Sequence, residues 1–228
     1  MVENFPATRI TTQPIESDVL VVADEHVFRS TDLGVSWEPI NCDWPGAGIR
    51  SLKTFPSDPY HIYALFGGKS SLYAFLEGNS CWQKIAGQDF LPGWAIQLDI
   101  ASDGNKIAFY AAVHVTSETR FFKSYDPASA WTELPRGLPA IDVFTVGNNQ
   151  IFACNKNGFY VLKNGEDTWA WRGKLPLLSS IWTMTIQPNS GYLYVAGTVY
   201  KENGKSFSTI IRSTDEGQTW ENAKYLNK

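Results

Sequence analysis

The chain consists of short runs of β-branched and aromatic residues separated by turn-forming residues. Near its end, residues 181–187, 192–197 and 207–212 are three such runs, and a fourth surrounds Trp220. These runs have the length and composition of β-strands, and the proline, glycine, asparagine and aspartate residues between them mark turns. Residues 49–86 repeat the same plan. Because no segment shows a helical period, the pattern predicts an all-β protein.

One turn motif recurs between the third and fourth predicted strands. Residues 29–37 read R-S-T-D-L-G-V-S-W and residues 212–220 read R-S-T-D-E-G-Q-T-W, so both fit S-x-D-x-G-x-x-W. Residues 124–131, S-Y-D-P-A-S-A-W, keep the frame with alanine in the glycine position. Two looser copies end at Trp82 and Trp169. The copies recur about every 45 residues, a period typical of propeller blades with four strands.

The repeat predicts a five-bladed β-propeller of four-stranded antiparallel blades, formed as a single domain by residues 1–228. The expected blades cover approximately 5–41, 48–86, 94–135, 140–175 and 180–226. Each blade is expected to use its own four strands, so that the ring closes without a shared blade. A β-sandwich is the alternative fold, but it does not explain turns of one type recurring in register. Packing between blade faces accounts for the nine tryptophans.

The motif resembles the Asp-box, or bacterial neuraminidase repeat, of sialidase-like propellers and photosystem assembly factors. The resemblance implies a propeller in which the box forms the turn between the third and fourth strands of a blade. The structural box residues that it implies are Ser30, Asp32, Gly34, Trp37, Ser124, Asp126, Trp131, Ser213, Asp215, Gly217 and Trp220.

The chemistry of these residues favours a structural role. Serine and aspartate side chains bond to nearby backbone N–H groups, and Gly34 and Gly217 permit a positive φ. Trp37 and Trp220 are expected to tuck under the hairpin. One carboxylate per turn is too few for Ca²⁺, which takes about six or more oxygen ligands. No metal and no cofactor is therefore expected.

Charge and cysteine content narrow the function further. The net charge is −4 and the pI is about 5.4, which argues against a nucleic-acid partner and against binding to an anionic membrane. Cys42, Cys81 and Cys154 form no C-x-x-C pair, so no zinc site is expected. Three buried structural cysteines are expected, with one disulfide as the alternative. No signal peptide or membrane-spanning run is seen, and the compartment stays open.

The loops opposite the boxes are the expected binding face. They join successive blades and the two middle strands of each blade, and the ligand-binding candidates on them or at the adjoining strand starts are Trp44, Arg50, Trp94, Arg136 and Trp182. A loop tryptophan is either a plug between blades or a platform for a sugar or protein partner. We hypothesise that Trp44 and Trp94, in matching inter-blade loops, help to form the binding face.

The function favoured by the sequence is a non-catalytic, monomeric binding module for a protein partner or a carbohydrate. The alternative is a glycoside-acting enzyme. A sialidase needs an arginine triad and an F/Y-R-I-P strand, whereas Arg9-Ile10 is flanked by Thr8 and Thr11. A two-carboxylate glycosidase needs two acids about 5–10 Å apart, for which Asp99 and Asp142 on predicted first strands are the candidates.

Overall fold

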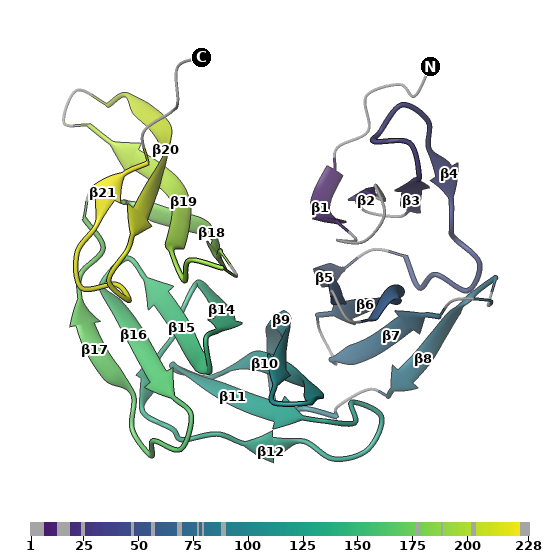
Figure 1. Ribbon diagram of the computed structural model, residues 1–228, viewed down its shortest axis with the longest axis horizontal. Coiled ribbons are helices and arrows are strands. Elements are labelled where there is room, and N and C mark those ends of the chain that lie inside the picture. Colours follow the sequence, from purple (N-terminus) through teal and green to yellow (C-terminus); the bar gives the residue numbers. More distant parts are fainter. Residues whose placement is uncertain are drawn as a thin grey trace. The chain divides into compact units, whose positions relative to one another are not determined.

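The computed structural model describes residues 7–12, 19–23, 26–46, 48–55, 58–67, 70–76, 78, 80–87, 90–176, 178–187, 189–201 and 204–223. These residues form antiparallel strands and turns, with no helix among them (Figure 1). No helix long and apolar enough to cross a membrane therefore occurs in the described part of the chain.

The strands form five sheets that follow one another along the chain. The first sheet contains β1 (Ala7–Thr12), β2 (Val19–Ala23), β3 (His26–Ser30) and β4 (Glu38–Pro39). The second sheet contains β5 (Ile49–Phe55), β6 (Asp58–Phe66), β7 (Ser71–Phe75) and β8 (Trp82–Ala86). The third sheet contains β9 (Trp94–Asp103), β10 (Lys106–Val115), β11 (Glu118–Ser124), β12 (Thr132–Glu133) and β13 (Leu138–Pro139).

The last two sheets have the same order of strands. The fourth sheet contains β14 (Val143–Gly147), β15 (Gln150–Asn155), β16 (Gly158–Lys163) and β17 (Ala170–Gly173). The fifth sheet contains β18 (Ser180–Ile186), β19 (Leu193–Tyr200), β20 (Ser206–Ser213) and β21 (Glu221–Asn222). The predicted meander of four strands is thus confirmed, and the third sheet gains a strand because β13 pairs with β11.

Each end of the chain completes its own sheet. Strand β1 pairs with β2, and β21 pairs with β20, so no described strand is exchanged between the first and fifth sheets. This is the arrangement expected from the sequence, in which each repeat supplies its own four strands.

The described residues fall into two compact units. One contains residues 1–101, 105–115 and 122–133, and the other contains residues 102–104, 116–121 and 134–228. In the first unit, Leu65 and Leu72 of the second sheet pack with Leu98 and Val113 of the third sheet, all fully buried. In the second unit, the fourth and fifth sheets pack in the same way. Apolar side chains between successive sheets therefore form the core of each unit.

A disulfide joins the exit of the first sheet to the last strand of the second. Cys42 and Cys81 are bonded across 39 residues, with their Cα atoms 4.5 Å apart. The expectation of three unbonded cysteines is therefore wrong, and the single-disulfide alternative holds. Cys154 is free and buried. Burial raises the pKa of the Cys154 thiol, and the nearby Asp142 carboxylate raises it further, so this thiol stays neutral.

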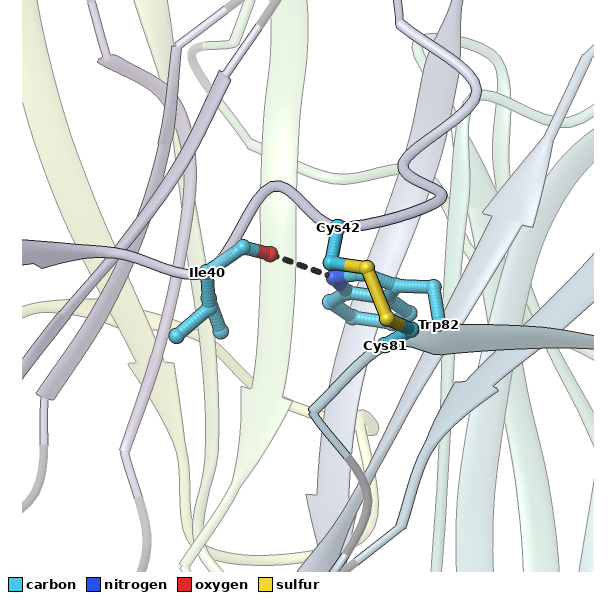
Figure 2. Close-up of a disulfide and its surroundings, with 4 residues drawn as sticks. All are labelled: Ile40, Cys42, Cys81 and Trp82. Carbon is cyan, nitrogen blue, oxygen red and sulfur yellow. Dashed lines mark hydrogen bonds between the residues drawn. A yellow bond between two sulfur atoms is a disulfide. The ribbon is translucent and has the colours of Figure 1, made fainter.

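Hydrogen bonds beside the disulfide hold the same two sheets together. The indole N–H of Trp82 donates to the carbonyl of Ile40 at 2.8 Å (Figure 2). The backbone N–H of Trp82 donates to the carbonyl of Cys42 at 2.9 Å. In the second unit, the indole of Trp169 donates to the carbonyl of Pro135 at 2.8 Å. The tryptophans that end the two looser motif copies thus bond to the segment that leaves the preceding sheet.

Removing the disulfide by Cys42→Ser with Cys81→Ser should lower the free energy of unfolding by about 2–4 kcal/mol, because the bond closes a long loop in the unfolded chain. Denaturant unfolding with and without dithiothreitol measures this effect. Dithiothreitol should destabilise the wild type and leave the double variant unchanged. Equal stability of oxidised wild type and double variant would contradict the structural role of the bond.

Gly34 and Gly217 provide a matched pair for a second prediction, since their φ angles are +85° and +84°. A Cβ at Gly34 would lie 3.5 Å from the Trp37 ring, whereas a Cβ at Gly217 would lie 2.1 Å from the Phe159 ring. Gly34→Ala should therefore cost about 1 kcal/mol of backbone strain, and Gly217→Ala should cost a further ~1–3 kcal/mol. Thermal unfolding of both variants tests this order, and equal costs would contradict it.

Candidate functional site

The turns at residues 30–37 and 213–220 have the same hydrogen bonds. The Ser30 hydroxyl donates to Asp32 Oδ1 at 2.8 Å and accepts the backbone N–H of Gly34 at 2.8 Å. Asp32 also accepts the backbone N–H and the hydroxyl of Ser36. The indole of Trp37 donates to the Gly34 carbonyl at 3.1 Å. We call these two segments the Ser-Asp-Gly-Trp turns, and in each of them the aspartate carboxylate accepts three hydrogen bonds.

The second of these turns repeats each bond. Asp215 accepts the Ser213 hydroxyl at 2.8 Å and both the N–H and hydroxyl of Thr219, and Trp220 donates to the Gly217 carbonyl. In both turns the residue before the glycine also has a positive φ, +59° at Leu33 and +58° at Glu216. The two turns therefore need two successive residues in the left-handed region.

Hydrogen bonding makes both aspartates stronger acids. The pKa of Asp32 is lowered from 3.8 to about 2. The main cause is the hydrogen bond from the Ser36 hydroxyl, followed by the bond from the Ser36 backbone N–H. At Asp215, desolvation acts to raise the pKa, but the bonds from Thr219 and Ser213 outweigh it and the pKa is lowered. Both carboxylates are fixed as structural anions in their turns.

The third copy of the motif folds differently. Ring closure holds the φ of a proline near −65°, so Pro127 cannot take the positive φ of Leu33 and Glu216. The Ser124 hydroxyl now donates to the carbonyls of Asp126 and Ala130, and the Asp126 carboxylate accepts the N–H of Ala128 at 3.1 Å. Trp131 still donates within its own turn, to the Pro127 carbonyl. The Asp126 carboxylate therefore accepts fewer hydrogen bonds from its own turn than the Asp32 carboxylate does.

The opposite end of each sheet is where the ligand-binding candidates were expected, and β-bulges shape it. In the second sheet Ile49 pairs with Phe66 and Ser51 with Leu65, which leaves Arg50 as the extra residue. In the fifth sheet the register shifts between Ile181 and Thr183, so Trp182 is the extra residue. Bulges re-aim side chains at the rims of sheets, which explains why these two side chains leave the strand alternation.

Arg50 meets Trp94 in the first unit. The Arg50 guanidinium carbon lies 5.3 Å from the centroid of the Trp94 ring, a cation–π contact. Half of the Trp94 surface is exposed, and Arg50 is half-buried. Gly67 lies against the arginine stem, because a Cβ there would sit 2.6 Å from Arg50 Nε. A side chain at position 67 would therefore move Arg50. Sequence reasoning missed Gly67, whose signal is the Gly-Gly pair at 67–68.

The other predicted ligand-binding residues have different surroundings. Trp44 packs against Phe66 and Trp82, with ring centroids 4.9 and 4.7 Å away, and it is partly buried against a core cluster of the first unit. Trp44 is thus a plug rather than an exposed platform. Trp182 is 55 % exposed and Arg136 is exposed, and both lie in the second unit. The structure brings together Arg50 and Trp94 of this set.

Asp99, the candidate acid for glycoside hydrolysis in the first unit, already has ion-pair and hydrogen-bond partners. The Asp99 carboxylate lies 2.9 Å from Lys53 Nζ and accepts the N–H of Ile100 at 3.1 Å. Asp99 is buried, and Lys53 is on the neighbouring first strand, β5. This ion pair links β5 and β9, the first strands of the second and third sheets.

A groove of about 500 Å³ lies in the first unit, beside the third turn. Its lining includes Tyr63, Asn105, Lys106, Phe109, Tyr125 and Asp126. Sequence reasoning assigned Asp126 a structural role and did not single out the others. The signal was present in the third copy of the motif, where proline and two alanines replace residues that the complete turns require.

Comparisons with known proteins identify the fold. No protein-family model matches this sequence, and no curated protein matches it. Among solved structures, Kuenenia stuttgartiensis hydrazine synthase aligns with a TM-score of 0.72 and 12 % identity, over 97 % of this chain and 68 % of that one. YCF48 from Cyanidioschyzon merolae aligns with a TM-score of 0.56 and 14 % identity, over 96 % of this chain and 85 % of that one.

A Niastella koreensis GH74 enzyme aligns with a TM-score of 0.54 and 18 % identity, over 90 % of this chain. This chain spans 29 % of the length of that enzyme chain. At such low identities the likeness shows the fold alone. Together with the five sheets, it shows that the protein is a β-propeller with five blades, and each sheet is one blade.

The lowered pKa values of Asp32 and Asp215 predict acid sensitivity. A carboxyl group whose pKa is lower in the folded state stabilises the fold at pH values above its unfolded pKa of 3.8. This stabilisation is lost as the pH falls from about 4 to about 2. The unfolding free energy of the wild type should therefore fall across this window. Asp32→Asn with Asp215→Asn should be less stable at pH 7 and should lose less on acidification.

Urea unfolding at a series of pH values measures this difference. Ser36→Ala with Thr219→Ala keeps both carboxylates but removes two of their donors, so its pH dependence should also be shallower. A pH dependence in both double variants as steep as that of the wild type would contradict the assignment.

Proposed function

We propose that this chain is a non-catalytic binding module of the Asp-box type, which recognises a protein partner through the blade ends opposite the Ser-Asp-Gly-Trp turns. The contact between Arg50 and Trp94 carries the proposal. Tryptophan and arginine are the residue types most enriched at the energetic centres of protein interfaces. Here they meet across two blades, with half of the indole surface accessible to a partner.

The same contact suits a protein partner at this position. The Arg50 guanidinium lies over one face of the Trp94 indole, so a partner meets a positive charge together with the exposed ring. The guanidinium is a planar fork suited to carboxylates and carbonyls, which proteins offer.

Two further observations support this function. Asp99 accepts from Lys53 and a backbone N–H, which favour its charged form, so Asp99 does not suit the role of the carboxylic acid that donates a proton in a glycosidase. The disulfide between Cys42 and Cys81 suits an oxidising compartment. We therefore expect a binding protein that acts in such a compartment.

Photo-crosslinking tests the proposal. The photoreactive residue p-benzoylphenylalanine in place of Trp94 should capture a protein from an extract of the source cells, and mass spectrometry should identify it. Binding of that purified protein is then measured by biolayer interferometry. Arg50→Ala and Trp94→Ala should each weaken binding by about 10-fold or more, as expected at an interface centre. Gly67→Ala should weaken it too, because it displaces Arg50 without removing it.

Trp171→Ala is the matched control, since Trp171 is an equally exposed tryptophan on the outermost strand of the fourth blade. It should leave the affinity unchanged. Binding that survives both Arg50→Ala and Trp94→Ala would contradict the proposal, and so would turnover of fluorogenic glycosides by the wild type.

A further inference from the structure

We propose that the groove beside the third turn is a binding site for a neutral saccharide, separate from the surface around Arg50 and Trp94. The groove lies at the end of the third blade that carries the turn after β11, whereas Trp94 starts β9 at the other end of that sheet. Its volume of about 500 Å³ falls within the range of small-molecule sites.

Aromatic rings line the groove. Tyr63 of the second blade and Phe109 of the third blade meet edge to face, with centroids 4.9 Å apart, and both are almost completely buried. Tyr125 is half exposed at the start of the turn. A buried aromatic base with one exposed ring offers an apolar surface to the C–H face of a sugar.

Two exposed polar side chains, Asn105 and Lys106, stand beside these rings. The side-chain amide of Asn105 and the ammonium of Lys106 make no hydrogen bond or ion pair to any residue that the structure describes. Lys106 Nζ lies 5.2 Å and Lys123 Nζ 4.9 Å from the centroid of the Tyr125 ring, so two ammonium groups flank this ring. These groups supply donors from the ammonium and both a donor and an acceptor from the amide.

Because the third turn departs from the motif, its aspartate, Asp126, can accept hydrogen bonds from a ligand. In the complete turns the aspartate carboxylate accepts three hydrogen bonds, including one from the hydroxyl of Ser36 or Thr219. Ala130 stands at that position in the third turn and has no hydroxyl, and Pro127 prevents the left-handed backbone. The Asp126 carboxylate consequently accepts one hydrogen bond from its turn, and Asp126 is one of the residues that line the groove.

This set of groups fits hydroxyl groups better than other ligand chemistry. A sugar hydroxyl donates to a carboxylate and accepts from an ammonium or amide, and the groove offers both kinds of partner in Asp126, Lys106 and Asn105. An apolar peptide would bury the Asp126 and Lys106 charges without partners, which is costly. A strongly anionic ligand would meet the Asp126 carboxylate. The structure thus assigns the groove to a neutral oligosaccharide.

Calorimetric titration of the full chain with hexasaccharides tests this assignment. The probes are β-1,4-linked glucose, mannose and xylose hexaoses, α-1,4-linked maltohexaose, and hexagalacturonate as the anionic comparison. We expect binding of at least one neutral probe. Tyr125→Ala should weaken it at least 10-fold, and Asp126→Asn and Lys106→Ala several-fold each. Tyr200→Ala, which removes an exposed tyrosine from the fifth blade, is the matched control and should leave binding unchanged.

A second variant separates binding from folding. Pro127→Glu, Ala128→Gly and Ala130→Thr give the third turn the residues of the fifth. Asp126 should then accept the threonine hydroxyl and withdraw from the groove, so saccharide binding should be lost while the thermal midpoint rises or stays the same. A purely structural Asp126 would not produce this combination.

The assignment is overturned if no neutral probe binds, if hexagalacturonate alone binds, or if Tyr125→Ala and Asp126→Asn bind as the wild type does. These outcomes are independent of the protein-partner proposal, because the groove variants should leave capture through position 94 unchanged. Loss of protein binding in Trp94→Ala with normal saccharide binding would likewise leave the groove assignment intact.

Discussion

The structure depends on burial of apolar surface between successive sheets. A four-stranded sheet of this chain carries alternating side chains on two faces, and one sheet alone cannot remove both faces from water. Leu65 and Leu72 of the second blade are fully buried because Leu98 and Val113 of the third blade cover them. The same packing joins the fourth and fifth blades. Stability therefore comes from neighbouring pairs of blades, as it does in repeat proteins generally.

Additional bonds fix how successive blades meet. The disulfide from Cys42 to Cys81 and the indole bond from Trp82 to Ile40 both join the exit of one blade to the last strand of the next. The indole of Trp169 makes the corresponding contact in the second unit. On the first strands of the second and third blades, Lys53 and Asp99 form an ion pair. The looser motif copies thus stabilise contacts between blades, whereas the complete copies stabilise their own turns.

The three aspartates of the motif show how local backbone geometry decides whether a polar side chain is available. Asp32 and Asp215 are saturated by hydroxyl and N–H donors of their own turns, and their lowered pKa values follow from those bonds. Asp126 shares their place in the motif but lacks the donor residue and the left-handed backbone. Because Pro127 and Ala130 replace the residues of the complete turns, Asp126 is not held by its turn as Asp32 and Asp215 are, and it lines a groove.

The sequence by itself determined the number of blades, their strands and their turns, because these follow from local alternation and from a motif whose bonds lie within eight residues. It also identified Arg50 and Trp94 as members of one face. It did not determine that Trp44 is a plug while Trp94 is exposed, or that Arg50 leaves the strand through a bulge. Only the tertiary structure decided these points, together with the disulfide and the groove, since each depends on which residues from different blades come within contact distance.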